Sequence, residues 1–393
     1  MLNFNFQNPT KINFGEGQIE VIAKEIPLNA RILVVYGGGS IKSNGVYQQV
    51  IDALTEHTWF EFSGIEPNPT YNTLMKAQEI IKAENINYLL AVGGGSVIDG
   101  AKFIAAAALY EGNGEGNDEG DDPWNILAKQ QAVTKALPIG AVLTLPATGS
   151  ESNGNSVVTR DGNKLPFKSP LIRPLFAVLD PSVTLSLSDR QIGNGVVDAF
   201  IHTIEQYLTY SVNGKVQDRF SEGILQTLIE EGPKALLPAT RNDLDVRANI
   251  MWSATMALNG LIGAGVPQDW STHMIGHELT GAFGIDHART LSIILPAVMK
   301  VRREKKREKL LQYATRVWQI TEGDDDARID QAIRLTEEFF VKMQVPTRLS
   351  DVELGSNDID LLVERLEHHG MTALGEQGDI TLAISREILT QAL

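Results

Sequence analysis

The chain has 393 residues, 43% of them hydrophobic and 21% charged, and its 49 acidic side chains outnumber its 34 basic ones to give a net charge of −15. This composition excludes a disordered or collagen-like chain, and the length suggests two domains at roughly 100 to 200 residues each. The acidic surplus argues against nucleic acid as a partner, because such binding needs basic side chains that neutralise phosphates.

Cysteine is absent, which excludes disulfides, thiolate nucleophiles, iron–sulfur clusters and cysteine-held zinc. Any bound metal must therefore have nitrogen and oxygen ligands. Residues 1–7 lack the basic and apolar regions of a secretory signal, so we expect a cytoplasmic protein. The long uncharged stretches, 137–150 and 253–268, are broken by glycine, proline or asparagine, so we expect no membrane span.

The first half of the sequence alternates β-branched runs with amphipathic segments, which is typical of a parallel sheet covered by helices. In chain order we expect a strand at 32–36, a helix at 47–54, a strand at 59–62, a helix at 74–83, a strand at 88–92, a helix at 98–109, and strands at 139–145 and 176–179. Residues 1–180 are therefore predicted to form an α/β nucleotide-binding domain. The acid- and glycine-rich segment 111–122 lacks the spacing of a calcium loop and is predicted to be a mobile surface loop.

Helical periodicity replaces the strand-like runs after Asp180 and Pro181. Helices are expected at 189–210, 216–231, 246–261, 268–283, 305–320, 329–343 and 380–393. Residues 181–393 are therefore predicted to form an all-α C-terminal domain.

Two glycine turns each follow a predicted strand and lead toward a helix. The first consists of Gly37, Gly38, Gly39 and Ser40, and the second of Gly93, Gly94, Gly95 and Ser96. Such turns expose backbone N–H groups and the positive end of a helix dipole, and glycine lets a phosphate approach closely. Neither turn has the spacing Gly-x-Gly-x-x-Gly, so tight strand-to-helix turns remain the alternative, with Ser96 and Asp99 resembling a capping box.

Two such turns in one βαβαβ unit favour phosphate binding over that alternative. NAD-selective sites generally place a carboxylate on the adenosine ribose, where it would repel a 2′-phosphate. The turn 37–40 carries no charge and Lys42 follows it. If this turn meets the adenosine ribose, NADP is preferred.

Histidine and aspartate recur at helical spacing in the second half of the chain. Asp198 and His202 are four residues apart, as are His273 and His277, so each pair lies on one face of a helix, and His287 follows. A lone histidine in an apolar helix is usually a satisfied core residue, but this pairing favours a metal site. The nitrogen and oxygen donors suit Zn²⁺ or Fe²⁺, whereas one carboxylate suits calcium or magnesium poorly.

These patterns resemble the iron-containing, or group III, alcohol dehydrogenase family, most closely its NADPH-dependent aldehyde reductase branch. The resemblance runs nearly end to end and is carried by segments 93–102, 145–151, 195–202 and 273–280 together with His287. It implies the dehydroquinate synthase-like architecture, in which an α/β dinucleotide-binding domain precedes an all-helical domain and the active site lies in the cleft between them. It also implies a homodimer.

The resemblance assigns roles to particular residues. The implied metal ligands are Asp198, His202, His273 and His287, while His277 is a proton relay that does not bind the metal. The implied cofactor contacts are Gly94, Gly95 and Ser96 for the pyrophosphate, Thr144, Leu145, Ser150, Lys164 and Leu179 for the nicotinamide and its ribose, and Asp99 near the reacting ring.

The expected reaction is hydride transfer between NADPH and short- to medium-chain aldehydes such as butanal, reversed in the oxidation of primary alcohols. Zn²⁺ is preferred as the metal because sites of this kind bind it more strongly than Fe²⁺, although the family name points to iron. Two alternatives stay open. One is a metal- and NAD-dependent lyase similar to dehydroquinate synthase, for which the segments bearing the candidate ligands hold too little basic charge. The other is a non-catalytic nucleotide-binding module with structural histidines.

Overall fold

A computed structural model describes residues 1–112 and 122–393. Their contacts separate them into a sheet unit, residues 7–186, and a helical unit, residues 187–393 together with 1–6. The boundary expected from the sequence lies after residue 180; the chain divides after Ser186 because Val183 is buried with the core of the sheet unit. Most of the acid- and glycine-rich segment, residues 113–121, lies outside the described residues.

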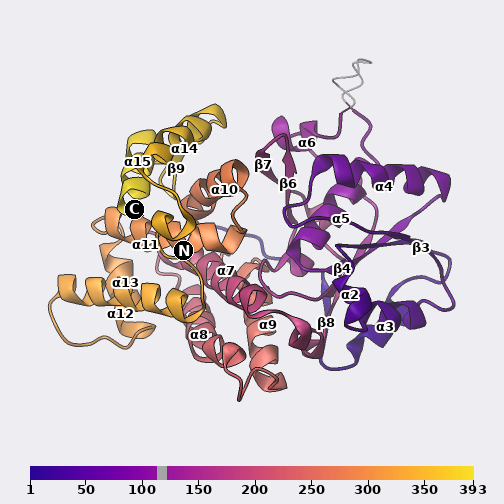
Figure 1. Ribbon diagram of the computed structural model, residues 1–393, viewed down its shortest axis with the longest axis horizontal. Helices are drawn as coiled ribbons and strands as arrows, with labels where there is room; N and C mark the ends of the chain where they lie inside the picture. The colour runs from indigo at the N-terminus through magenta and orange to yellow at the C-terminus, as the bar shows by residue number, and fades with distance from the viewer. Residues whose placement is uncertain (113–121) are drawn as a thin grey trace. The chain divides into compact units, whose positions relative to one another are not determined.

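The sheet unit contains one parallel six-stranded sheet in the order β1-β8-β5-β4-β2-β3 (Figure 1). The strands are β1 (Lys11–Phe14), β2 (Arg31–Tyr36), β3 (Thr58–Phe62), β4 (Tyr88–Gly93), β5 (Ile139–Leu143) and β8 (Phe176–Leu179). The parallel sheet expected from the sequence is confirmed. Strand β1 is an addition, since its four residues are too short and too exposed to stand out as a hydrophobic run.

Helices cover both faces of this sheet. The helices of this unit are α1 (Ile22–Glu25), α2 (Ser40–Ser43), α3 (Val46–Ala53), α4 (Tyr71–Ala83), α5 (Gly95–Ala107) and α6 (Asn125–Ala128), with 3-10 helices η1 (Gln18–Val21), η2 (Ser150–Ser152), η3 (Pro170–Ile172) and η4 (Pro181–Ser186). Alternate strand residues such as Ile32 and Val34 pack with Val50 of α3, while α4 and α5 pack on the opposite face (Figure 1). An antiparallel hairpin, β6 (Asn155–Arg160) and β7 (Asn163–Lys168), packs against α5.

The strand order reverses between β2 and β4, which are hydrogen-bonded neighbours with Tyr36 opposite Val92. In open α/β sheets, ligands bind beyond the carboxyl ends of the strands at such a reversal. Because the two glycine turns directly follow β2 and β4, the fold brings them side by side at this edge.

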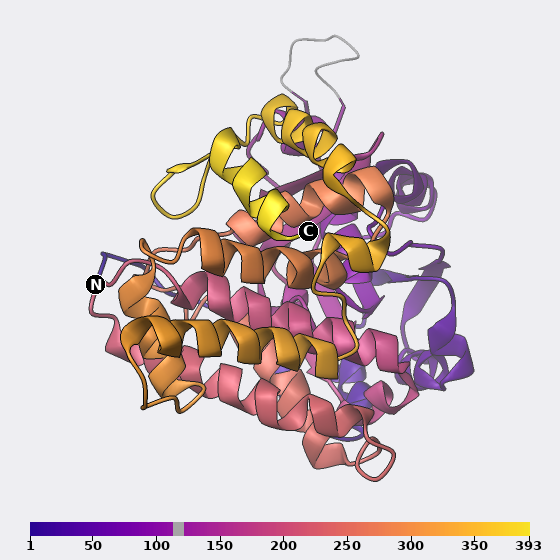
Figure 2. The ribbon, with the colours of Figure 1, turned by 60° about the vertical axis from the view of Figure 1, so that its left-hand side comes forward.

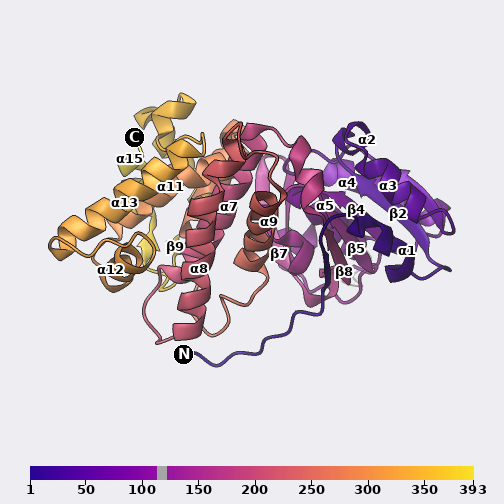
Figure 3. The ribbon, with the colours of Figure 1, turned by 90° about the horizontal axis from the view of Figure 1, so that it is seen from below.

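The helical unit carries nine α-helices among its residues 187–393, all of them described. They are α7 (Asp189–Tyr207), α8 (Lys215–Glu231), α9 (Leu244–Leu258), α10 (Ser271–Phe283), α11 (His287–Val301), α12 (Arg307–Arg316), α13 (Asp325–Lys342), α14 (Ser356–His368) and α15 (Leu382–Gln391), with 3-10 helices η5 (Pro233–Leu236) and η6 (Leu349–Val352) and short strands β9 (Ala373–Leu374) and β10 (Ile380–Thr381). Figure 2 shows these helices stacked alongside one another, and Figure 3 shows α7 beside α8 and α9. The sequence patterns miss α11, because Pro296 inside it reads as a helix stop, and they also miss α14.

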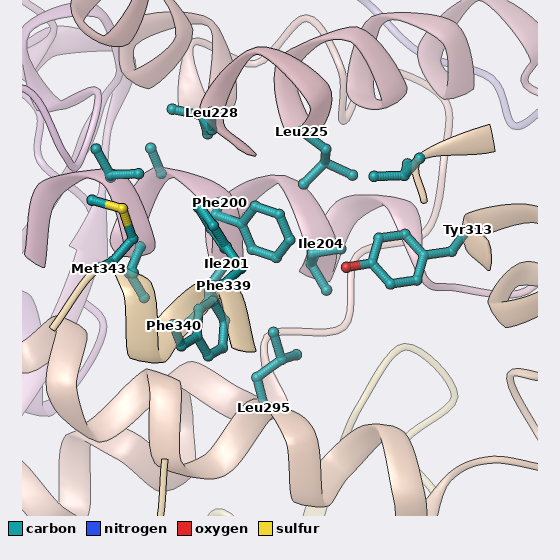
Figure 4. Packing of buried hydrophobic residues seen from close by; sticks show 14 of the residues in the cluster. Phe200, Ile201, Ile204, Leu225, Leu228, Leu295, Tyr313, Phe339, Phe340 and Met343 are labelled. Carbon is teal, nitrogen blue, oxygen red and sulfur yellow. The ribbon is translucent and has the colours of Figure 1, made fainter. Parts of the chain in front are cut away.

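Helix α7 lies at the centre of the helical core (Figure 4). Its Phe200 packs against Phe339 and Phe340 of α13, with ring centroids 5.1 and 5.7 Å apart, and Leu225 of α8 belongs to the same cluster. A helix buried on nearly every side has little freedom to shift. The side chains that α7 presents to a site are therefore held on a fixed backbone.

None of the helices in residues 1–112 and 122–393 has the length and hydrophobicity that a membrane span requires.

Candidate metal centre and nucleotide-binding turns

Helix α7 supplies the first two candidate ligands. It begins with a capping box, in which Ser188 and Gln191 satisfy each other's backbone N–H groups, and it continues as one unbroken helix to Tyr207. Asp198 and His202 therefore lie one turn apart, and both are buried. His202 Nδ1 is 3.8 Å from Asp198 Oδ2, a spacing that leaves room for both atoms to bind one ion.

Helices α10 and α11 supply the remaining candidates. His273 and His277 are one turn apart on α10, and His287 is the first residue of α11. One ligand atom each from Asp198, His273 and His287 lies within 4.8 Å of the others, and Asp198 Oδ1 is 3.7 Å from His287 Nε2. The structure thus brings a donor from α7 together with donors from α10 and α11, which lie much later in the sequence.

The other two histidines border this cluster. The ring of His202 stacks on that of His273 at a centroid distance of 4.6 Å, and the ring of His277 is 5.1 Å from that of His287. All five groups predicted from the sequence therefore meet at one place. Which of them bind a metal, and whether His277 only relays a proton, stay predictions.

The donor set fits a divalent cation. Asp198 Oδ1 is buried, yet it accepts no hydrogen bond from any described residue, and such an atom needs a partner. One carboxylate and three imidazoles match the nitrogen and oxygen ligands that Zn²⁺ and Fe²⁺ take in proteins.

Glu205, which the sequence patterns do not single out, forms a hydrogen bond with one of these imidazoles, that of His273. Its carboxylate accepts hydrogen bonds from His273 Nδ1 and, at 2.7 Å, from the backbone N–H of Thr272. Burial, followed by the charge of Asp269, raises the pKa of Glu205 to about 8, and it is the ionised form that accepts both hydrogen bonds. A carboxylate behind a metal-binding histidine orients the ring. The feature of the sequence that could have indicated Glu205 is its position, about one helical turn after His202 in α7.

The glycines of the two turns are required for different reasons. A Cβ added at Gly38 or Gly39 would meet nothing within 4 Å, so open space lies beside this backbone, and Gly39 has a φ of +97°. A Cβ at Gly93 would lie 2.6 Å from the Val97 side chain, and one at Gly95 would lie 2.5 Å from Thr148 Oγ1. The first turn can therefore admit a ligand, while close packing alone already requires glycine at 93 and 95.

Asp99 is engaged in hydrogen bonds within the sheet unit. Its Oδ1 accepts from Ser150 Oγ at 2.5 Å, and its Oδ2 accepts from the N–H of Val157 in the hairpin at 3.0 Å. Lys102 also reaches Ser150 Oγ, at 2.7 Å, and is fully buried. Asp99 and Ser150 thus form part of a polar cluster that fastens α5 to the hairpin, and their contacts with a cofactor stay predictions.

The other predicted cofactor contacts differ in their hydrogen bonds and in how exposed their side chains are. Lys164 on β7 donates to Asn68 Oδ1 at 2.9 Å. Thr144 and Leu145 follow β5 and are partly exposed. Leu179 has a fully buried side chain, and its carbonyl accepts from the N–H of Gly15 at 3.0 Å. The geometry leaves Thr144 and Leu145 more accessible to a cofactor than Lys164 and Leu179, which are both buried.

Comparisons with known proteins show the family to which the chain belongs. The family described as iron-containing alcohol dehydrogenase matches residues 9–181, and its C-terminal part matches residues 193–375. The chain is 57% identical to the NADPH-dependent aldehyde reductase YqhD of Escherichia coli K12, with 100% of both chains covered.

Solved structures of similar proteins point to the same family. A crystal structure of E. coli YqhD matches with a TM-score of 0.96 at 56% identity, covering 100% of this chain and 99% of the other. The NADH-dependent butanol dehydrogenase A of Thermotoga maritima matches with a TM-score of 0.93 at 36% identity, again covering 100% and 99%. The chain therefore belongs to the iron-containing alcohol dehydrogenase family, and it is an oxidoreductase of the alcohol dehydrogenase and aldehyde reductase type.

Proposed function

We propose that this enzyme interconverts short- to medium-chain aldehydes, such as butanal, and primary alcohols, using NADP(H) and one divalent metal. The observation that carries the proposal is the meeting of ligand atoms from Asp198, His273 and His287 within 4.8 Å, beside His202. The relative named as an NADPH-dependent aldehyde reductase supports the reaction class, and the relative named as a butanol dehydrogenase supports the substrate size. No observation favours the lyase or the non-catalytic module.

A group of four side chains beside the first glycine turn supports NADP over NAD. Glu61 Oε2 on β3 accepts hydrogen bonds from Tyr36 at 2.8 Å and Tyr47 at 3.0 Å, and it lies 3.4 Å from Lys42 Nζ. The Tyr36 hydroxyl, then that of Tyr47 and the charge of Lys42, hold the pKa of Glu61 below its usual range. The Glu61 carboxylate is therefore already occupied by hydrogen bonds, while the Lys42 side chain stays half exposed and can form an ion pair with a 2′-phosphate.

The residues present indicate how the reaction would proceed. Asp198, His202, His273 and His287 would hold the cation, and the turns after β2 and β4 would hold the dinucleotide through backbone N–H groups. When bound, the cation supplies Lewis acidity toward a carbonyl oxygen and the reduced nicotinamide supplies hydride. Glu205 keeps the His273 ring in one orientation, with Nδ1 turned toward the carboxylate and Nε2 away from it.

His277 is positioned to hold or deliver the proton that the product alcohol needs. It is buried on the same face of α10 as His273, and its ring lies beside that of His287. An imidazole has a pKa near neutrality, which suits general acid catalysis. We assign it the proton-relay role for this reason.

The metal is Zn²⁺ or Fe²⁺. Sites of nitrogen and oxygen ligands bind Zn²⁺ more strongly, whereas the description of the family names iron. The homodimer and the cytoplasmic location expected from the sequence stay predictions.

Initial rates of butanal reduction test the proposal. They are measured with NADPH and with NADH on protein of known metal content, before and after a chelator. We expect turnover with NADPH, a lower kcat/KM with NADH, loss of activity on chelation, and recovery with Zn²⁺ or Fe²⁺. Activity that survives complete removal of metal would contradict the assignment.

A further inference from the structure

A buried lysine joins the helices that carry the candidate metal ligands. Lys306 is only 4% exposed and lies between α11 and α12. Its Nζ is 2.5 Å from Asp269 Oδ2, 2.6 Å from the carbonyl oxygen of Leu208, and 3.1 Å from both carboxylate oxygens of Glu376. A buried ammonium with this many oxygen partners is held in one place.

Two of these partners adjoin the metal centre. Leu208 directly follows α7, the helix that bears Asp198 and His202. Asp269 stands just before α10, the helix that bears His273. Lys306 therefore bridges the end of one ligand-bearing helix and the start of another.

Asp269 extends this connection on both sides. Its Oδ1 accepts from the N–H of Ser271, the first residue of α10, at 2.9 Å, and its own N–H donates to the carbonyl of Glu205 in α7 at 2.9 Å. Although burial alone would raise it, the charge of Lys306 holds the pKa of Asp269 below its usual range. The carboxylate is thus ionised and bound to the start of α10, while the backbone of Asp269 is bound to α7.

The backbone between Asp269 and α10 needs such a restraint. Trp270 has a φ of +63°, a left-handed conformation that a bulky side chain rarely adopts. Strained residues of this kind persist only where the surrounding structure imposes them, and they gather at functional sites. The ring of Trp270 lies 5.3 Å from that of His273.

We propose that Lys306, acting through Asp269 and Leu208, is a positioning residue that sets His273 against Asp198 and His202. The inference rests on the metal centre proposed above. It assigns Lys306 no contact with substrate or metal. It predicts that metal affinity depends on this lysine more strongly than on other buried lysines of the same unit.

Lys309 provides a matched control. It lies three residues further along the chain, is 5% exposed, and its Nζ is 2.5 Å from Asp218 of α8. It therefore has a similar burial and a similar ion pair, but Asp218 belongs to a helix without candidate ligands. Its Nζ also lies 4.6 Å from the ring centroid of Tyr207 in α7, whereas the hydrogen bonds and ion pairs of Lys306 lead to both α7 and the start of α10.

The test measures Zn²⁺ affinity of the full chain, stripped of metal, by competition with a chromogenic chelator, alongside thermal unfolding without metal. We expect the wild type to bind one equivalent, K306M to bind about tenfold to 100-fold more weakly, K306R to recover most of the loss, and K309M to resemble the wild type. Equal affinity in K306M and the wild type, or equal losses in K306M and K309M, would overturn the proposal.

Removing both charges separates positioning from general stability. The double variant D269N/K306M removes both charges of the ion pair, so neither residue leaves an unpaired buried charge. We expect its thermal stability to recover relative to K306M while its Zn²⁺ affinity stays low. If K306M does not fold, this double variant and K306R carry the comparison. Recovery of stability and affinity together in the double variant would show a merely structural role. A wild type that binds no Zn²⁺ under these conditions would overturn the proposed metal centre and this inference with it.

Discussion

Glu205 accepts a hydrogen bond from Nδ1 of His273, and both residues are buried. The bond joins the middle helix of the core, α7, to the start of α10. It leaves Nε2 as the ring nitrogen that faces the other candidate ligands, because Nδ1 is already occupied. The tautomer and the direction of the imidazole are therefore set before any ion arrives.

Replacing Glu205 tests this relationship. We expect E205A to lower the affinity for Zn²⁺ about tenfold to 100-fold, the range typical of partners behind a metal ligand, and E205Q to lose less because its amide oxygen still accepts a hydrogen bond. Calorimetric titration of metal-free protein measures both. E222Q is the control, since Glu222 is also buried but bonds Tyr207 and Arg316. An unchanged affinity in E205A would refute the role of Glu205.

The two histidines of α10 should respond differently to removal. H273A is expected to lose bound metal and activity together, because it removes a ligand. H277A should keep its metal while kcat falls about 100-fold or more, the contribution typical of a positioned general acid. Metal content and the pH profile of kcat distinguish the two. An H277A rate equal to wild type at every pH would remove the relay assignment, and an H273A enzyme that keeps metal and activity would refute the ligand set.

Lys42 should determine the preference for NADPH. K42A removes the exposed charge beside the first glycine turn, so we expect kcat/KM for NADPH to fall about tenfold while that for NADH changes little. Y47F should shift the ratio in the same direction by freeing Glu61 from one of its hydrogen bonds. K24A, which alters an exposed lysine on α1, is the control. Equal losses with both cofactors in K42A would exclude contact with a 2′-phosphate.

Lys102 should make the stability of the protein depend on pH. Burial lowers the pKa of Lys102 from 10.5 to about 8, against the charges of Asp99 and Glu151, which raise it. Between pH values of about 8 and 10.5, Lys102 is protonated in the unfolded chain but has lost its proton in the folded chain. The free energy of unfolding therefore rises with pH across this range. The rise attributable to Lys102 amounts to at most about 3 kcal/mol.

Urea denaturation at about pH 7.5 and about pH 10 measures this effect. The wild type should gain stability relative to K102M between the two conditions, while K135M, which alters an exposed lysine, should follow the wild type. A difference between wild type and K102M that does not change with pH would show that Lys102 does not titrate in this range.

The sequence predicts those features that depend on local periodicity. Asp198 with His202 and His273 with His277 each lie on one face of a helix because four residues make about one turn, and the glycine turns follow strands that stand out as apolar runs. His287 follows these pairs in the sequence and the family resemblance assigns it the role of a ligand, but its position depends on the packing of α11 against α10.

Features that depend on contacts between distant segments could not be predicted. Glu205 and Lys306 are ordinary charged residues in the sequence, and only the packing of α7, α10 and α12 gives them partners. Pro296 inside α11 and Pro166 inside β7 read as breaks, although both elements form. Hydrogen bonding and packing by neighbouring elements override these local signals.

Anomalous diffraction from crystals of the enzyme grown with Zn²⁺ or Fe²⁺ tests the central claim most directly. We predict one strong anomalous peak, at the absorption edge of the supplied metal, within bonding distance of Asp198, His202, His273 and His287. A peak elsewhere, or none among these four side chains in protein that turns over aldehyde with NADPH, would contradict the account.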